Sequence, residues 1–375
     1  MKITDVQSVR VGDALLVAVH TDAGLTGVGE SGCWAFPHNV EVMVQKFGQY
    51  LVGKDPVRIE HHWHMMWRMG PFRSAVLGAA VSAIDAAMWD LKGLRLDVPV
   101  HQLLGGPYRD RIRLHKIIGG SNAEAIGKAA RDAADQGFTA VKFDPLGLTA
   151  IDHSLQQMVE EAVKRATAIR DATTGTVDII AEVHRSLSPH QFPALVDALR
   201  PFCPIFIEDP IQIDTIDVQT GLTRLGAPLG LGERWQSLWE VREALAAAGP
   251  FVVRADINLA GGITAGRKMA AVAEAHHAQV SWHNWLGPVS DAATLTVDAS
   301  IPNVLTHEHA PANLSLFGEA ISSDWTVEEG HMVVPSTPGL GVRVDFDRLP
   351  QRVEYLGREL HEIPLRSDGS VAFAL

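Results

Sequence analysis

The chain has 375 residues, of which 46% are hydrophobic, and its formal net charge at pH 7 is −12. This length and composition exclude intrinsic disorder and predict either two domains or one large α/β barrel with an accessory domain. The acidic balance argues against nucleic acid as a partner, because neutralising phosphates requires a basic surface.

The N-terminus and the cysteines indicate the compartment. The first residues, M-K-I-T-D-V-Q-S-V-R, carry charges where a secretory signal needs an apolar core. We find no run of the roughly 18 apolar residues that a membrane-spanning helix needs. Cys33 and Cys203 lie far apart in the sequence, so free thiols in a reducing compartment are expected rather than a disulfide. These features predict a soluble cytoplasmic protein without a membrane partner.

The N-terminal section predicts an α+β domain over residues 1–110. Alternating apolar residues up to about residue 29 predict an antiparallel hairpin or meander. The following segment, 29–38, is rich in glycine and aromatic residues and predicts either a loop that covers the substrate or an ordinary surface loop. Helices are expected over residues 39–51 and 59–69 and around a core stripe formed by Leu77, Val81, Ile84, Met88 and Leu91.

Three histidines cluster in the second expected helix, E-H-H-W-H-M-M-W-R-M. A metal site is one interpretation of His61, His62 and His64. No cysteine or carboxylate completes a ligand set at useful spacing, so we favour an amphipathic helix with Trp and Met in the core and His directed outward.

From residue 111 onward, short apolar strands alternate with Ala-rich helical segments. The predicted strands cover residues 111–116, 139–144, 178–184, 204–210, 228–234, 251–257, 279–284 and 303–309. Eight strands with intervening helices predict a (β/α)₈ TIM barrel over residues 111–330. Residues 331–375 return to strand and turn patterns, and we expect them to rejoin the N-terminal domain.

Most of the predicted strands end in one ionisable residue. These residues are Lys142, Glu182, Glu208, Glu233, Asp256, His283 and Glu308, and successive members from Glu182 are separated by 26, 25, 23, 27 and 25 residues. The C-terminal ends of barrel strands meet on one face, where active sites form. The pattern therefore predicts an active site on that face.

The residue types indicate the chemistry. Glu182, Glu208 and Glu233 offer oxygen donors to a hard cation such as Mg²⁺, whereas zinc would call for His or Cys. Asp256 can orient His283 as a general base. Strand alternation would place His184 on the same face as Glu182, where it could act as an acid.

Two further predicted roles concern negative charge on the substrate. Lys142, with Asp144 beside it, suits a substrate carboxylate or a developing oxyanion, and Glu308 could bond the same oxyanion if it is protonated. A base, an acid and a divalent cation together favour removal of a proton next to a carboxylate.

Several motifs resemble those of the enolase superfamily, and within it the mandelate racemase-like group. They are A-A-V-S-A-I-D-A-A-M-W-D-L-K-G (79–93), P-V-H-Q-L-L-G-G (99–106), I-E-D-P (207–210), L-G-E-R (231–234), D-I-N-L-A-G-G-I-T (256–264), W-H-N-W-L-G-P-V-S (282–290) and P-G-L-G-V (338–342). The resemblance covers nearly the whole chain. It implies a modified barrel, an α+β capping domain built from both termini, and a homo-oligomer.

Glu182-x-His184 together with the Asp256/His283 pair resembles the sugar-acid dehydratases of the galactonate type. The resemblance implies that Glu182, Glu208 and Glu233 bind Mg²⁺ and that His283 takes the C2 proton of a small acid-sugar substrate. His184 would then help the C3 hydroxyl to leave as water, giving a 2-keto-3-deoxy acid. The predicted substrate-contacting residues are Lys142, Asp144, Arg234, Trp34 and Arg73.

The sequence departs from the family pattern at two positions. Glu182 stands where the family most often has Asp, so the ligand is one methylene longer. Lys142-Phe143-Asp144 stands where the racemases have Lys-x-Lys, which argues against a racemase with two bases.

Three alternatives remain. A cycloisomerase that opens a sugar-acid lactone or an anhydro-sugar acid would use the same base and metal. A metal-dependent hydrolase is suggested by His307-x-His309, although in that class the motif belongs to the first strand and here it lies on the eighth. The third alternative is a non-catalytic binding barrel.

Overall fold

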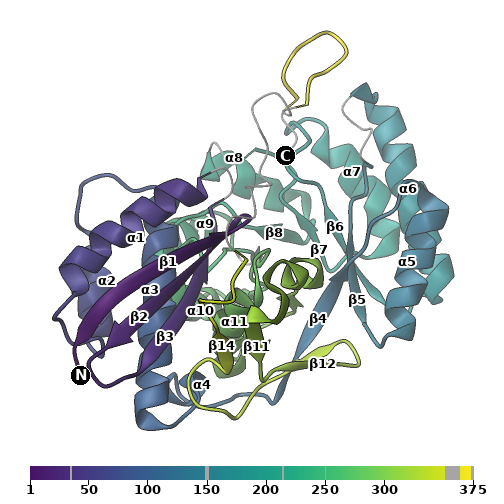
Figure 1. Cartoon of the computed structure of the whole chain (residues 1–375). Helices are drawn as coiled ribbons and strands as arrows, with labels where there is room; N and C mark the ends of the chain where they lie inside the picture. The colour runs from purple at the N-terminus through teal and green to yellow at the C-terminus, as the bar shows by residue number, and fades with distance from the viewer. Residues whose placement is uncertain (34–35, 148–151, 213–214, 250, 351–363, 373–375) are drawn as a thin grey trace.

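The chain folds into a closed barrel with an α+β domain packed beside it, as predicted (Figure 1). This computed structural model describes residues 1–33, 36–147, 152–212, 215–249, 251–350 and 364–372, so Trp34 lies outside the described residues. None of the helices within those ranges is long and apolar enough to cross a membrane. Cys33 and Cys203 are free thiols.

The N-terminal domain consists of an antiparallel three-stranded sheet and a layer of helices. The strands are β1 (Ile3–Val11), β2 (Ala14–Thr21) and β3 (Thr26–Ser31), in that order. The helices are α1 (Pro37–Leu51), α2 (Ile59–Trp67), α3 (Ala75–Leu96) and the short α4 (Val100–Leu103). The predicted meander and the three predicted helices are therefore confirmed.

Helix α3 is packed unusually close to β3. A Cβ atom on Gly29 would lie 1.9 Å from the Ala83 carbonyl oxygen, and one on Gly27 would lie 2.1 Å from that of Ala87. Such separations are impossible for any side chain, so both positions require glycine. The close approach fixes the end of β3 against the helix that leads to the barrel.

Helix α2 differs from the prediction at His62. The expectation that the histidines of this helix point outward is wrong for His62, because only 2% of its surface is exposed to solvent. Its ring bonds the Tyr50 hydroxyl at 3.0 Å and the Asp55 carbonyl at 2.9 Å. Both ring nitrogens are satisfied, which makes burial of the polar ring tolerable.

The barrel strands run in parallel in the order β4 to β9. They are β4 (Arg111–Ile117), β5 (Ala140–Phe143), β6 (Asp178–Glu182), β7 (Phe206–Glu208), β8 (Leu229–Leu231) and β9 (Val252–Val253). Val280 bridges Val253 and Val304, and β10 (His307–Glu308) pairs with β4. These contacts close the ring, and most of the strands are shorter than predicted.

Helices cover the outside of the barrel. They are α5 (Ala123–Asp135), α6 (Leu155–Thr173), α7 (Phe192–Leu199), α8 (Ile216–Gly221), α9 (Leu238–Ala248), α10 (Gly262–Ala275) and α11 (Pro288–Ser300), with short 3₁₀ turns at Arg200–Phe202, Leu222–Leu225 and Pro311–Ala320. Asn122, Ser154 and Ser237 cap α5, α6 and α9 by accepting a backbone N–H. Polar caps of this kind define where each helix begins.

The segment after the barrel touches both domains. Strand β13 (His331–Val333) joins β12 (Thr326–Glu328) to β4, and β11 (Ile321–Ser323) pairs with β14 (Val342–Val344). The Gly339 carbonyl accepts from Val100 N at 2.9 Å. The carboxylate of Asp90 on α3 accepts from Val28 N and Leu340 N, so residues near 340 lie against the N-terminal domain.

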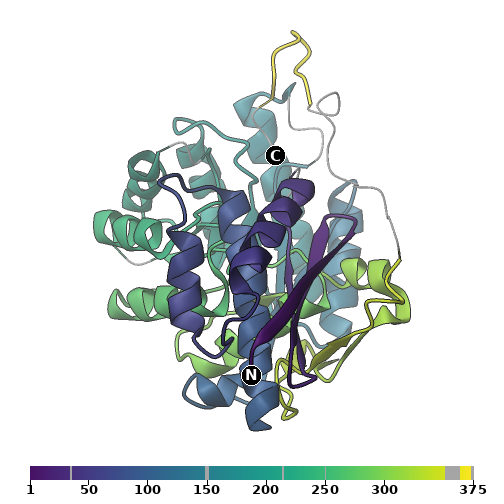
Figure 2. The ribbon, with the colours of Figure 1, turned by 60° about the vertical axis from the view of Figure 1, so that its left-hand side comes forward.

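The N-terminal domain lies against the barrel (Figure 2), and buried carboxylates attach the two parts to each other. Asp85 on α3 accepts from the backbone N–H and hydroxyl of Thr264 at 2.9 and 2.6 Å. Glu30, near the end of β3, accepts the backbone N–H groups of Gly287, Val289 and Ser290 at the start of α11. The second attachment begins at Gly287, on the segment that follows the predicted base, His283.

Candidate active site

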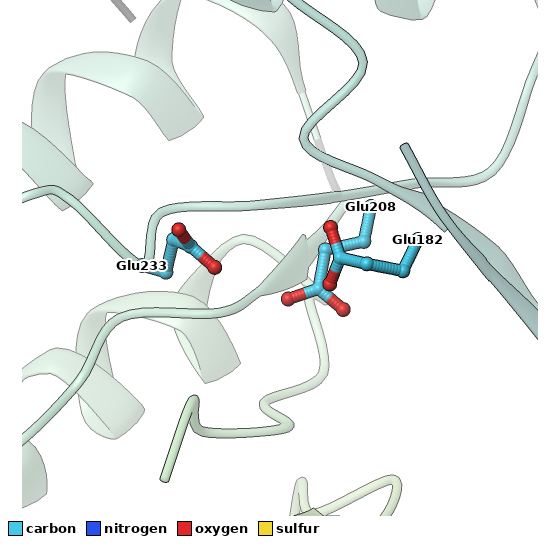
Figure 3. A group of neighbouring side chains, drawn as sticks. All are labelled: Glu182, Glu208 and Glu233. Atoms are coloured by element: carbon cyan, nitrogen blue, oxygen red, sulfur yellow. The ribbon is translucent and has the colours of Figure 1, made fainter. Parts of the chain in front are cut away.

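Three glutamates converge at the C-terminal ends of β6, β7 and β8. Glu182 and Glu208 are direct partners in the parallel register, and Glu233 follows β8 by two residues. Each offers a carboxylate oxygen within 4.8 Å of the others. Figure 3 shows Glu182 and Glu208 side by side, with Glu233 pointing toward them from the other side.

This glutamate trio has the properties of a cation site. Glu182 and Glu208 are buried at 3% and 0% exposure. Burial raises the pKa of Glu208 to about 7, and repulsion from Glu182 adds to the rise against the opposing charge of Arg254. Carboxylate oxygens held this close favour a hard divalent cation, and the residues present therefore fit a Mg²⁺-type ion.

Lys142 lies among these ligands. Its ammonium is 3.1 Å from Glu182, 3.3 Å from Glu208 and 2.5 Å from Glu308. Burial opposes its charge, but the three carboxylates raise its pKa above the ordinary range. The adjacent predicted residue, Asp144, accepts the backbone N–H groups of Leu146 and Gly147 and closes its own loop.

His283 and Asp256 form the predicted pair. His283 Nδ1 is 2.8 Å from Asp256 Oδ2, which leaves Nε2 facing Glu233 at 3.9 Å and Glu308 at 4.0 Å. Burial lowers the pKa of His283, but the Asp256 bond and the charge of Glu233 outweigh it and raise the value to about 9. Asp256 thus fixes the ring with Nε2 directed at the glutamates.

His184 is placed by a turn, and not by the strand in which it was predicted. Strand β6 ends at Glu182, and His184 and Arg185 follow with φ angles of 50° and 61°. The His184 backbone N–H donates to Glu182 Oε1 at 3.1 Å, and its side chain is exposed. Desolvation by the surrounding protein and the positive charge of Lys142 lower the pKa of His184.

Glu308 is surrounded by donors. It accepts from Lys142, from Arg254 at 2.7 Å, from His115 at 3.1 Å and from the backbone of Asn284 at 3.1 Å. Burial opposes ionisation, but Arg254 and Lys142 hold the pKa of Glu308 well below its usual range. These charges favour the ionised carboxylate, whereas the predicted oxyanion role requires the protonated form, so that role stays a prediction.

Charged residues that sequence reasoning missed support the glutamates. Arg185 contacts the Glu233 carboxylate and lies 3.5 Å from Asp209. Arg254 is completely buried between Glu208 and Glu308. An arginine within the apolar run F-V-V-R-A-D-I was a visible signal, because charged residues in buried strands need partners.

Two of the predicted substrate-contacting residues, Arg73 and Arg234, have partners in the barrel. The Arg73 guanidinium stacks over the Trp239 ring at 4.5 Å, and Trp239 lies 6.2 Å from Trp67. Arg234 Nε is 3.9 Å from Glu233 Oε1. Arg73 thus joins the N-terminal domain to α9 of the barrel.

The His-x-His motif on β10 is engaged elsewhere. His307 Nδ1 is 2.8 Å from Asp298, and His309 Nδ1 is 2.9 Å from Asp291. Within the described part of the chain, the glutamate trio is the group of His, Cys, Asp and Glu that could hold a metal. The His307-x-His309 motif therefore does not support the metal-dependent hydrolase alternative.

Family models match both parts of the chain. The model described as mandelate racemase/muconate lactonizing enzyme, N-terminal domain, matches residues 2–105, and the model described as enolase C-terminal domain-like matches residues 125–348.

Curated proteins and solved structures resemble the whole chain. D-galactonate dehydratases from Xanthomonas oryzae pv. oryzae and Variovorax paradoxus are 35% and 33% identical, each over 99% of this chain and 100% of the relative. An enolase from Agrobacterium radiobacter, provisionally described as a galactarate dehydratase and solved with sodium and L-malate, has a TM-score of 0.91 at 27% identity over 100% of both chains. A member of the enolase superfamily from Salmonella Typhimurium has a TM-score of 0.87 at 26% identity, over 93% of this chain and 97% of the other.

Proposed function

Because the chain belongs to the mandelate racemase/muconate lactonizing enzyme family of the enolase superfamily, we propose that it is a Mg²⁺-dependent sugar-acid dehydratase. Its substrate is an aldonate or an aldarate, and its product is a 2-keto-3-deoxy acid. The observation that carries the proposal is the glutamate trio beside the His283/Asp256 pair, with His184 bonded through its backbone N–H to Glu182. The names of the curated relatives support the same reaction class.

The first step belongs to His283. Its Nε2 takes the proton from C2 of the substrate, while Asp256 holds Nδ1–H and stabilises the imidazolium that forms. Glu182, Glu208 and Glu233 would hold Mg²⁺, which supplies positive charge to the substrate carboxylate as electrons move toward it.

The second step belongs to His184. Its imidazolium donates a proton to the C3 hydroxyl, the C3–O bond breaks, and water leaves. The resulting enol takes a proton at C3 and becomes the 2-keto-3-deoxy acid. A substrate carboxylate beside the exposed ring would favour the protonated donor form, offsetting the charge of Lys142.

A panel of aldonic and aldaric acids incubated with the protein and Mg²⁺ tests this proposal. A carbonyl-specific assay should detect a 2-keto-3-deoxy product from at least one acid. If every acid stays unchanged while a sugar-acid lactone is consumed, the cycloisomerase alternative replaces the dehydratase.

A further inference from the structure

Arg254 is a buried cation that the proposed reaction does not use. It directly follows β9 and precedes Asp256 by two residues, and its side chain is completely buried. Its guanidinium donates to Glu208 Oε1 at 2.6 Å, to Glu308 Oε2 at 2.7 Å, and to the carbonyls of Ser281 and Trp282 at 2.6 and 2.9 Å.

These partners connect both halves of the site. Glu208 belongs to the glutamate trio, whereas Trp282 immediately precedes His283. One rigid side chain therefore bonds β7, β10 and the segment that carries the base. A guanidinium can do so because its planar fork holds five N–H donors in fixed directions.

The contact also orients the Glu208 carboxylate. Arg254 holds Oε1, while Oε2 faces Lys142 at 3.3 Å. With its two oxygens bonded in different directions, the carboxylate plane is defined before any cation arrives. Outer partners of this kind orient metal-ligating carboxylates and control metal affinity.

We propose that Arg254 is a positioning residue that orients Glu208 toward the cation and holds the backbone at His283 through the Trp282 carbonyl. The inference rests on the proposed function, because it takes Glu208 as a metal ligand. Lysine retains the charge but has no planar fork, so it cannot make the same bonds at once. Methionine removes both the charge and the donors.

Arg254→Lys and Arg254→Met test the proposal, with Arg165→Lys and Arg165→Met as matched controls. Arg165 is also buried, at 4% exposure, but it bonds Glu161 and Gly120, neither of which belongs to the site. Mg²⁺ is titrated by calorimetry into chelator-treated protein, and thermal unfolding is followed without metal.

We expect the Arg254 variants to bind Mg²⁺ roughly 10- to 100-fold more weakly than the wild type. The Arg165 variants should keep wild-type affinity even where their melting temperature falls. In folded Arg254→Lys, proton exchange at C2 should remain slower at saturating Mg²⁺, because the base is also displaced.

The outcomes distinguish a failure of this inference from a failure of the proposed function. Wild-type Mg²⁺ affinity and wild-type exchange in Arg254→Lys would overturn this inference alone. Equal loss of affinity in the Arg165→Lys control would show a general effect of burial and would also overturn it. A wild-type protein that does not bind Mg²⁺ would overturn the proposed function, and this inference with it.

Discussion

Charge at the strand ends is balanced by buried cations. The acids are Glu182, Glu208, Glu233 and Glu308, and the cations that face them are Lys142, Arg185 and Arg254. Burial raises the pKa of Glu233, but the charges of His283 and Arg185 lower it to about 2. The acids that surround His283 raise its pKa to about 9, and a divalent cation beside them would bring that value down toward the range of a base.

His283→Asn removes the proton acceptor but leaves the glutamate trio intact. We expect the rate of C2 proton exchange with solvent deuterium to fall by about 10²- to 10⁴-fold, because this is the usual contribution of a positioned base. Proton NMR of the substrate measures the exchange. Undiminished exchange in a folded variant that still binds Mg²⁺ would remove His283 from its role.

His184→Asn separates the two steps. Proton removal at C2 should continue, because His283 is unchanged, whereas formation of the keto acid should fall by about 10²-fold or more. NMR and a carbonyl assay on the same sample measure both rates. The exposed His190, on the same loop, provides His190→Asn as a control with wild-type rates, and equal loss of both rates in His184→Asn would contradict the assignment.

Among the elements, the end of β3 connects the two domains at the site. Glu30 is 1% exposed and caps the start of α11 with three backbone bonds. Burial raises its pKa to about 7 from an ordinary 4.5, against the effect of those bonds. The folded protein therefore binds a proton on Glu30 that the unfolded chain releases between these two pH values.

Glu30→Gln should change the pH dependence of stability. Because the folded state holds the Glu30 proton more tightly, the contribution of Glu30 to the unfolding free energy should fall as pH rises from about 4.5 to 7 and then level off. The part due to Glu30 amounts to a few kcal/mol, and the variant should lack it. Urea unfolding across this pH range measures the difference, with Glu124→Gln on the exposed start of α5 as a control. Parallel pH curves for Glu30→Gln and the wild type would contradict the prediction.

The contact between β3 and α3 predicts a large cost for one methyl group. Gly29→Ala should lower the unfolding free energy by about 3 kcal/mol or more, because the new Cβ would overlap the Ala83 carbonyl. Gly70→Ala is the matched control, since a Cβ there meets nothing within 4 Å. Equal stability of the two variants in chemical denaturation would show that the helix can move away.

The elements themselves could largely be predicted from sequence, because apolar periodicity reflects burial directly. The burial of His62 could not be predicted, because it depends on the Tyr50 hydroxyl and the Asp55 carbonyl, and only the folded chain brings these groups to the ring. The strand end at Glu182 was also missed, because the left-handed backbone at His184 and Arg185 leaves no trace in the hydropathy pattern.

For the whole molecule, the regular spacing of ionisable residues was sufficient to predict which of them gather at one end of the barrel. The trio and the His283/Asp256 pair meet as expected because parallel strands of a barrel end on one face. The supporting cations could not be assigned in the same way. Arg185 and Arg254 act through partners on other strands, and such pairings exist only once the barrel is closed.

Dehydration by this route makes a specific isotopic prediction, which is the most direct test of the proposed function. A sugar acid converted in D₂O with Mg²⁺ should give a 2-keto-3-deoxy acid that carries one solvent deuterium at C3, because the C2 proton is lost and the enol is protonated at C3. NMR and mass spectrometry of the product measure the position and number of deuterons. A product without deuterium at C3, or acids that remain unchanged while a lactone is opened, would contradict the account.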